Sequence, residues 1–242
     1  MRDAFKKILR DWAFNLKWRC NACNEENFNG KYFCNDCLKT LPIIRENKCA
    51  HCGRLTYYST QYCDSCIDKN IYFDKAISVF SYEEPISVMV QNLKYNSKLY
   101  LADIFCDYFL EIFFSNFSDT DVITFVPSTQ KSLRKRGYNQ SKILADKLSK
   151  IVNLPVVSTA LKIKETPNQV TLNYYERKEN LLGVFTQDKV DVKGKNILLV
   201  DDVLTTGSTA DNLAKIFKKN KANKVYVLTI ASVSKVKFKD FK

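Results

Sequence analysis

Apolar and polar residues along residues 71–242 follow patterns that predict strands and helices in turn. Four short segments have the pattern of buried or half-buried strands, at 75–82, 121–127, 196–202 and 224–233, and a fifth segment, 154–163, opens in an extended conformation. Between them lie segments with the period of helices, at 85–95, 99–114, 139–152 and 208–220. Such alternation is typical of a parallel sheet covered by helices, so we expect an α/β fold.

The first 70 residues follow no such pattern. Residues 1–18 place apolar side chains at near-helical spacing among Lys and Arg, which predicts a short basic amphipathic helix. We expect this helix to pack on its own protein, with a membrane-surface anchor as the alternative. No segment approaches the roughly 20 apolar residues of a membrane span, and the charged start is unlike a signal peptide. The expected location is the cytoplasm, with peripheral attachment at the inner face of the membrane left open.

Eight of the nine cysteines form four Cys-x-x-Cys pairs: Cys20 and Cys23, Cys34 and Cys37, Cys49 and Cys52, and Cys63 and Cys66. Two such pairs supply the four thiolates of a tetrahedral Zn²⁺ site, so we expect two zinc ions. Sequential pairing is the simplest, and spacing does not exclude pairing the first pair with the third. Disulfides are the alternative, which a reducing compartment disfavours. Because four thiolates leave no open position for water, the sites are expected to be structural. His51 lies inside the third pair; we expect it near the zinc ligands or in solvent, with a role as a ligand in place of a neighbouring cysteine as the alternative.

The segment NILLVDDVLTTGSTA (196–210) carries the strongest candidate chemistry. Ligands of open α/β sheets bind beyond the carboxyl ends of the strands, where Asp201 and Asp202 are expected to emerge. The carboxylates suit ribose hydroxyls, bound directly or through Mg²⁺. Backbone N–H groups, hydroxyls and a helix N-terminus suit a phosphate monoester, and they come from Thr205, Thr206, Gly207, Ser208 and Thr209. The segment therefore predicts a ribose 5-phosphate site. The alternative is an Asp-rich turn with a threonine cap.

Composition and charge narrow the chemistry further. The chain has 242 residues, 45% of them hydrophobic, as expected for a folded protein. Its net charge of +12 indicates anionic partners, namely nucleic acid, phosphorylated ligands or acidic lipid. A single histidine, itself beside zinc ligands, effectively excludes Ser-His-Asp and Cys-His catalysis. Any chemistry must rest on carboxylates, cations and bound metal.

Several segments resemble a known family. LLVDDVLTTGSTA (198–210) resembles the phosphoribosyl pyrophosphate (PRPP) signature of type I phosphoribosyltransferases. Three further segments resemble motifs of the ComF/ComFC competence family: LKYNSK (93–98), VPSTQKSLRKRGYNQSKILA (126–145) and TPNQVTLNYYERKENLLGVF (166–185). The cysteine pairs resemble the zinc module that precedes the domain in many members. One departure is that Tyr138 stands where Phe is usual.

This resemblance implies a domain organisation and a set of site residues. It implies a type I phosphoribosyltransferase-like domain over residues 71–242, preceded by an N-terminal helix and a double zinc-ribbon module over 1–70. PRPP would bind at residues 205–209 and at the catalytic pair Asp201 and Asp202. Pyrophosphate, its Mg²⁺ and the surrounding loops would involve Lys94, Ser128, Lys131, Arg134, Arg136, Gly137, Tyr138, Asn139, Gln140 and Arg177. Residues 134–140 are expected as a loop leading into a helix. For Lys94 a solvated surface position is an equal alternative.

The function implied by the resemblance is the handling of single-stranded DNA in natural transformation, with PRPP and Mg²⁺ bound by the second domain. Other competence proteins are candidate partners. Two alternatives remain: a phosphoribosyltransferase that acts on a base or amine, and a regulator that senses PRPP without turnover. Phosphoribosyl transfer depends on positioning and electrostatics, so the lack of a catalytic histidine does not forbid it. Catalysis is left open at this point.

Overall fold

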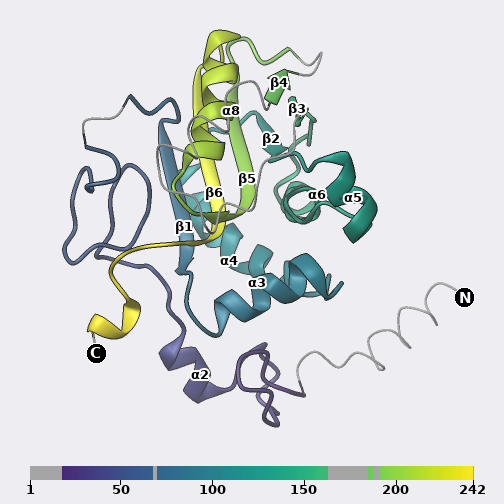
Figure 1. Ribbon diagram of the computed structural model, residues 1–242. Coiled ribbons are helices and arrows are strands. Elements are labelled where there is room, and N and C mark those ends of the chain that lie inside the picture. The colour runs from purple at the N-terminus through teal and green to yellow at the C-terminus, as the bar shows by residue number, and fades with distance from the viewer. Residues whose placement is uncertain (1–17, 68–69, 163–184, 188–190, 242) are drawn as a thin grey trace, which may run out of the picture.

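The computed structural model describes residues 18–67, 70–162, 185–187 and 191–241 (Figure 1). The helix expected at the N-terminus lies outside this part of the chain except for its last residue. Across the described ranges, no helix combines the length and the apolarity that crossing a membrane requires.

A four-stranded sheet forms the centre of the fold (Figure 1). Its strands are β1 (Lys75–Ser81), β2 (Val122–Phe125), β5 (Asn196–Leu204) and β6 (Lys224–Ser232). Their order is β1-β6-β5-β2, and every neighbouring pair is parallel. A parallel bridge between Ile123 and Val156 adds a fifth, short segment beside β2. The short strands β3 (Ala160–Lys162) and β4 (Phe185–Gln187) form a separate antiparallel pair. The parallel α/β fold expected from the sequence is confirmed.

Helices cover both faces of the sheet, as the alternating pattern predicts. One face packs on α3 (Ile86–Tyr95), α4 (Leu101–Asn116) and α6 (Gln140–Val152), and the other on α8 (Ser208–Lys219). Successive residues of a strand point to opposite faces, so Leu198 and Val200 join the first core cluster while Ile197 and Leu199 join the second. All four side chains are fully buried. Strand β5, like its inner neighbour β6, therefore contributes side chains to both cores.

Strand β5 is longer than expected. It runs to Leu204, and Asp201 pairs with Thr229 of β6 inside the sheet. The two acids were expected at the end of the strand, but the strand ends two residues after Asp202. The parallel partner β6 continues alongside to Ser232, which keeps the backbone extended past the acids.

The basic segment before α6 is helical, where a loop was expected. Helix α5 (Gln130–Arg136) contains both arginines of the segment. Its first turn is capped by Thr129, whose hydroxyl accepts a hydrogen bond from the Ser132 N–H at 3.1 Å. It ends at Gly137, which has a left-handed φ of 80° and lets the chain turn into α6.

The cysteine-rich region packs directly on the sheet and contains the short helix α2 (Asn35–Thr40). Residues 42–44 lie antiparallel to the outer edge of β1: the Ile44 N–H donates to Val79 O at 2.9 Å and the Ser81 N–H to Pro42 O at 2.8 Å. The Ala76 N–H donates to His51 O at 2.8 Å. These bonds satisfy backbone groups that an edge strand otherwise leaves open. The domain boundary at residue 70 stays a prediction. A short 3₁₀ helix, η1 (Phe238–Phe241), closes the described chain.

Candidate functional site

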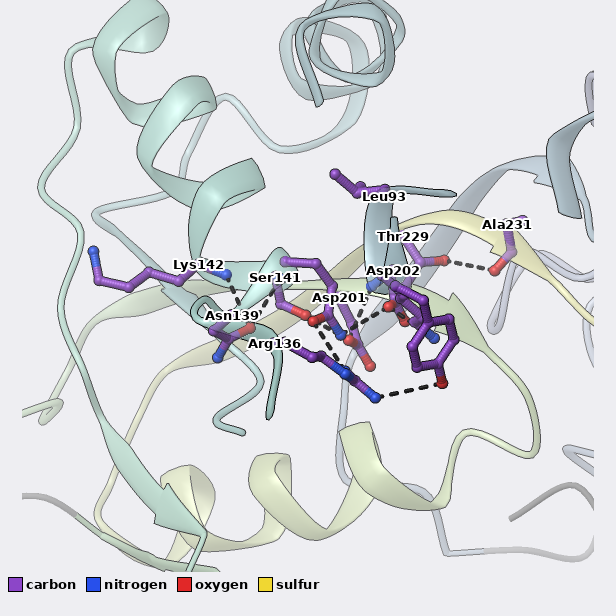
Figure 2. A network of polar contacts seen from close by, with 12 residues as sticks. Leu93, Arg136, Asn139, Ser141, Lys142, Asp201, Asp202, Thr229 and Ala231 are labelled. Atoms are coloured by element: carbon purple, nitrogen blue, oxygen red, sulfur yellow. Dashed lines mark hydrogen bonds and ion pairs between the residues drawn. The ribbon is translucent and has the colours of Figure 1, made fainter. Parts of the chain in front are cut away.

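Two carboxylates lie side by side near the carboxyl end of β5, and we call Asp201 and Asp202 the acid pair (Figure 2). The Lys94 ammonium on α3 lies 2.8 Å from Asp202 Oδ2, and the Gln140 amide donates to the same oxygen at 2.9 Å. The Ser141 hydroxyl donates to Asp201 Oδ1 at 2.8 Å. Three elements distant in sequence, α3, β5 and the start of α6, therefore meet at the acid pair.

Burial and charge shift the titration of this cluster. Burial and the neighbouring charge of Asp202 raise the pKa of Asp201 from 3.8 to about 7, against the opposing effects of Lys94 and the Ser141 hydroxyl. Burial alone would lower the pKa of Lys94, but the two carboxylates outweigh it and raise that pKa. Lys94 therefore stays protonated near neutral pH. A single ammonium facing two carboxylates leaves the site with an affinity for further cations.

The turn after β5 leads directly into α8. Gly207 has a left-handed φ of 83° and precedes the first residue of the helix. In contrast to the N-cap residues of α5 and α6, Gly207 has no side chain to cap the helix, and the first N–H of α8, that of Ser208, donates to the Thr206 hydroxyl at 3.3 Å. The Thr206 and Ser208 hydroxyls lie 2.8 Å apart at this turn. A helix start flanked by hydroxyls suits an anion, because its first N–H groups lack backbone partners within the helix.

A residue of the cysteine-rich region supports this turn. The Arg54 guanidinium donates to Thr205 O at 2.5 Å, and Arg54 is only 8% exposed. Its Nε atom is buried and has no hydrogen-bond partner. Sequence reasoning missed Arg54, because nothing local to the Cys-x-x-Cys pattern connects it with a loop 151 residues away. Its guanidinium adds positive charge beside the start of α8.

The eight paired cysteines form two separate groups of four. The sulfur atoms within each group lie within 4.8 Å of one another, and the groups are Cys20, Cys23, Cys34 and Cys37, and Cys49, Cys52, Cys63 and Cys66. Individual Sγ–Sγ distances are 3.9 Å for Cys23 and Cys34 and 3.7 Å for Cys52 and Cys63. A tetrahedron with Zn–S bonds of about 2.3 Å requires sulfurs about 3.8 Å apart. Both groups fit zinc, and the sequential pairing is confirmed over the interleaved one.

His51 lies outside both sulfur groups, as expected. Its ring stacks on Phe73 with a centroid distance of 5.1 Å. The second sulfur group, Phe73 and the buried side of α8 share one core cluster, whereas Cys20 belongs to the cluster on the other face of the sheet. The two zinc sites therefore support opposite sides of the fold.

Comparison with known proteins agrees with this geometry. Residues 11–67 match the family model described as "Double zinc ribbon domain", and residues 132–240 match "Phosphoribosyl transferase domain". The chain is 28% identical to Competence protein F of Haemophilus influenzae, over 89% of this chain and 97% of that protein. It is 30% identical to DNA utilization protein YhgH of Escherichia coli, over 74% of this chain and 81% of that protein. Competence protein ComFC of Bacillus subtilis is 24% identical, over 81% of this chain and 82% of its own length.

The chain belongs to the competence protein F (ComF) family. The resemblance read from the motifs is thereby confirmed. The zinc-ribbon match includes all eight clustered cysteines, and the phosphoribosyltransferase match includes the acid pair and the turn into α8.

The structure brings some of the expected site residues together. Lys94 and Gln140 contact the acid pair directly. Arg136 lies next to them: its guanidinium donates to Gln140 Oε1 at 3.3 Å and sits 4.8 Å from the ring centre of Tyr95 (Figure 2). Ser141, which sequence reasoning missed, is buried against Asp201. The only local signal for it is its place in the first turn of α6, directly after Gln140.

Other expected residues have structural contacts of their own. The Tyr138 hydroxyl donates to Leu93 O at 2.5 Å, which fixes the ring against the end of α3. Asn139 caps α6, with its Oδ1 accepting from the Ser141 N–H at 3.0 Å, and its amide donates to Val126 O at 3.0 Å. Gly137 supplies the turn between α5 and α6.

The remaining expected residues are not joined to the acid pair. Lys131 and Arg134 are exposed on α5, and Ser128 is half-buried before it. Within the described ranges, no hydrogen bond or ion pair connects these three side chains with the acid pair. Arg177 lies outside the described residues.

Proposed function

We propose that this chain is a competence protein that handles single-stranded DNA during natural transformation and binds PRPP with Mg²⁺ at the acid pair. One observation carries the ligand proposal: a short turn joins two carboxylates near the end of β5 to a helix N-terminus that is lined by hydroxyls. A phosphate monoester suits the helix start, and a ribose diol suits the carboxylates. The names of the relatives, which refer to competence and DNA utilization, support the biological role.

The contacts at the acid pair suggest how a cation and a pyrophosphate would be accommodated. Asp201 Oδ1 and Asp202 Oδ2 accept the hydrogen bonds from neighbouring side chains, so the opposite carboxylate oxygens are the natural ligands for Mg²⁺. Mg²⁺ would neutralise charge on the pyrophosphate. Lys94, at the end of α3, would supply positive charge beside the pyrophosphate.

The test of the ligand proposal is calorimetric titration of the zinc-loaded chain with PRPP in the presence of Mg²⁺. We expect saturable binding that requires Mg²⁺ and weakens at least tenfold in an Asp201→Asn/Asp202→Asn double variant. Lys142→Gln, on the exposed side of α6, is the matched control and should bind as the wild type does. Equal PRPP affinity in the wild type and the double variant would overturn the proposal.

Turnover is decided by a separate measurement. A transferase acting on a base or amine releases pyrophosphate from PRPP once an acceptor is supplied, and the acid pair would stabilise positive charge that develops at the ribose. A PRPP sensor binds the same ligand without release. Pyrophosphate release that disappears in the double variant supports the transferase, and binding without release with every acceptor supports the sensor.

The DNA proposal rests on the net charge of +12 and the relatives' names. Binding through several Lys and Arg contacts should weaken log-linearly as salt rises. Fluorescence anisotropy with a labelled single-stranded oligonucleotide at several salt concentrations measures this slope. A weak, salt-independent signal would contradict DNA binding and leave the PRPP proposal intact.

A further inference from the structure

A cleft of about 820 Å³ opens beside the acid pair. Its walls come from the second zinc ribbon (residues 54–65), α3, the end of β5 and the chain that follows β6. Lys94, Thr205 and Thr206 line it, so its inner end is continuous with the candidate ligand site. The cleft thus joins the two halves of the molecule at the place where the chemistry is expected.

Five tyrosines line this cleft, and we call it the tyrosine cleft: Tyr57, Tyr58, Tyr62, Tyr82 and Tyr95. Four of them are at least half exposed, with exposed fractions of 64% for Tyr57, 72% for Tyr58, 50% for Tyr62 and 58% for Tyr95. Large aromatic rings gathered at such exposure in one groove indicate a binding surface more than a core. Tyrosine presents a flat face for stacking and loses little conformational entropy when it binds.

Neighbouring groups hold several of these rings in place. The Tyr62 ring lies 5.5 Å from the His51 ring beside the second zinc site, and the Tyr95 ring lies 4.8 Å from the Arg136 guanidinium. Tyr57 lies 6.4 Å from Phe241 of η1. Rings held in this way lose less conformational entropy on binding, and Arg136 already covers one face of Tyr95.

The charges of the cleft are mainly positive. Arg54, Lys94 and Lys235 line it, against one lining carboxylate, that of Asp64, while the Lys94 ammonium is also paired with Asp202, which does not line the cleft. Arg54 is more than nine-tenths buried, and its guanidinium is held by the hydrogen bond to Thr205 O. Exposed aromatic faces with cations beside them are the combination that binds unpaired bases and their phosphates. A duplex hides its base faces, and a single free base would use only one of the rings.

We propose that single-stranded DNA lies in the tyrosine cleft, with its bases stacked on the tyrosines of the second zinc ribbon and its backbone passing Arg54 and Lys94. This inference rests on the proposed DNA function and adds the site and the means of recognition. The second zinc ribbon, in this arrangement, supplies the stacking surface, and the phosphoribosyltransferase-like domain supplies the opposite wall.

Fluorescence anisotropy with an oligothymidylate of about 15 nucleotides tests the site. Replacing both Tyr57 and Tyr58 by Ala should weaken binding roughly thirtyfold or more, because each stacked base contributes at least about fivefold. Replacing both by Phe keeps the ring faces and should retain affinity within about threefold. Phe28→Ala is the matched control, since Phe28 is 78% exposed on the first zinc ribbon and does not line the cleft.

The outcomes separate this inference from the proposed function. If the Tyr57→Ala/Tyr58→Ala variant binds DNA as tightly as the wild type, the cleft is not the site, although the DNA function stands. Equal losses in this variant and in Phe28→Ala would also overturn the site. Thymidine binding as tightly as the oligonucleotide would indicate an acceptor-base pocket instead of a strand. If the wild type binds no single-stranded DNA at low salt, the proposed function and this inference fail together. Unchanged PRPP binding and zinc content confirm that each variant is folded.

Discussion

Gly53 lies directly against the backbone of β1. Its φ is +67°, and a Cβ atom at this position would lie 2.6 Å from Ala76 O and 2.7 Å from Ile77 Cα. Both atoms belong to the backbone of β1, which is held by its pairing with β6. Neither can move aside as the end of a side chain could. Gly53→Ala should therefore force the ribbon and the sheet apart.

The expected loss of stability has two parts. A left-handed backbone costs an alanine roughly 1–2 kcal/mol, and overpacking of a rigid contact adds about 1–3 kcal/mol. The sum is about 2–5 kcal/mol. For a chain of this size, 1 kcal/mol shifts the melting temperature by roughly 2–4 °C, so Gly53→Ala should lower it by roughly 4–20 °C.

Two other glycines allow the cost of the close contact to be separated from the cost of the left-handed backbone. Gly30 and Gly194 have φ values of +70° and +72°, and a Cβ atom at either position would meet nothing within 4 Å. Gly30→Ala and Gly194→Ala should therefore show only the first part, about 1–2 kcal/mol. Thermal and denaturant unfolding of the zinc-loaded variants gives the difference. If Gly53→Ala is no less stable than the two controls, the close packing of the second ribbon on β1 is refuted.

Three further predictions concern charge and metal. Lys94→Gln should lower the free energy of unfolding, measured in urea titrations, by roughly 3–5 kcal/mol, because Asp202 loses its buried partner. Lys142→Gln breaks an exposed ion pair and should lower it by less than about 1 kcal/mol. Folding raises the pKa of Asp201 from 3.8 to about 7, so the folded chain holds this proton more tightly. The wild type should thus lose stability relative to Asp201→Asn as pH rises from about 4 to about 7, and equal pH profiles would contradict this. Zinc chelation should lower the melting temperature of the sheet as well as that of residues 20–66, because the second sulfur group lies in a core cluster of the sheet. If calorimetry shows that chelation leaves the unfolding transition of the sheet unchanged, the shared core is refuted.

Local patterns were sufficient for much of the fold. The buried run at residues 197–200 predicts β5, and the periodicity of residues 208–220 predicts α8, because both signals reflect burial on defined faces. The helix at 130–136 was missed although its signals were present: Thr129 with Ser132 marks the start and Gly137 the end. The segment was interpreted from its many basic residues as a binding loop, and the capping residues were not considered. The extension of β5 to Leu204 depends on pairing with β6, which no local pattern contains.

The candidate site could be predicted only in part. Asp201, Asp202 and the turn into α8 are contiguous in sequence, so their chemistry was visible together. Lys94 was a candidate, but its contact with Asp202 crosses from α3 to β5 and needs the folded chain. Ser141 was missed for the same reason. A serine early in a helix has many ordinary roles, and only tertiary contact distinguishes this one.

Three consecutive residues explain why the zinc ribbon and the site act as one structure. Cys52 belongs to the second sulfur group, Gly53 packs on the backbone of β1, and Arg54 donates to Thr205 O at the turn into α8. Each contact limits the freedom of the next, because the three are joined by adjacent peptide bonds. Zinc bound by Cys52 therefore fixes the direction in which Arg54 leaves the ribbon. The zinc ion has no open coordination position for a ligand. It nevertheless determines where the Arg54 guanidinium lies beside the candidate phosphate site.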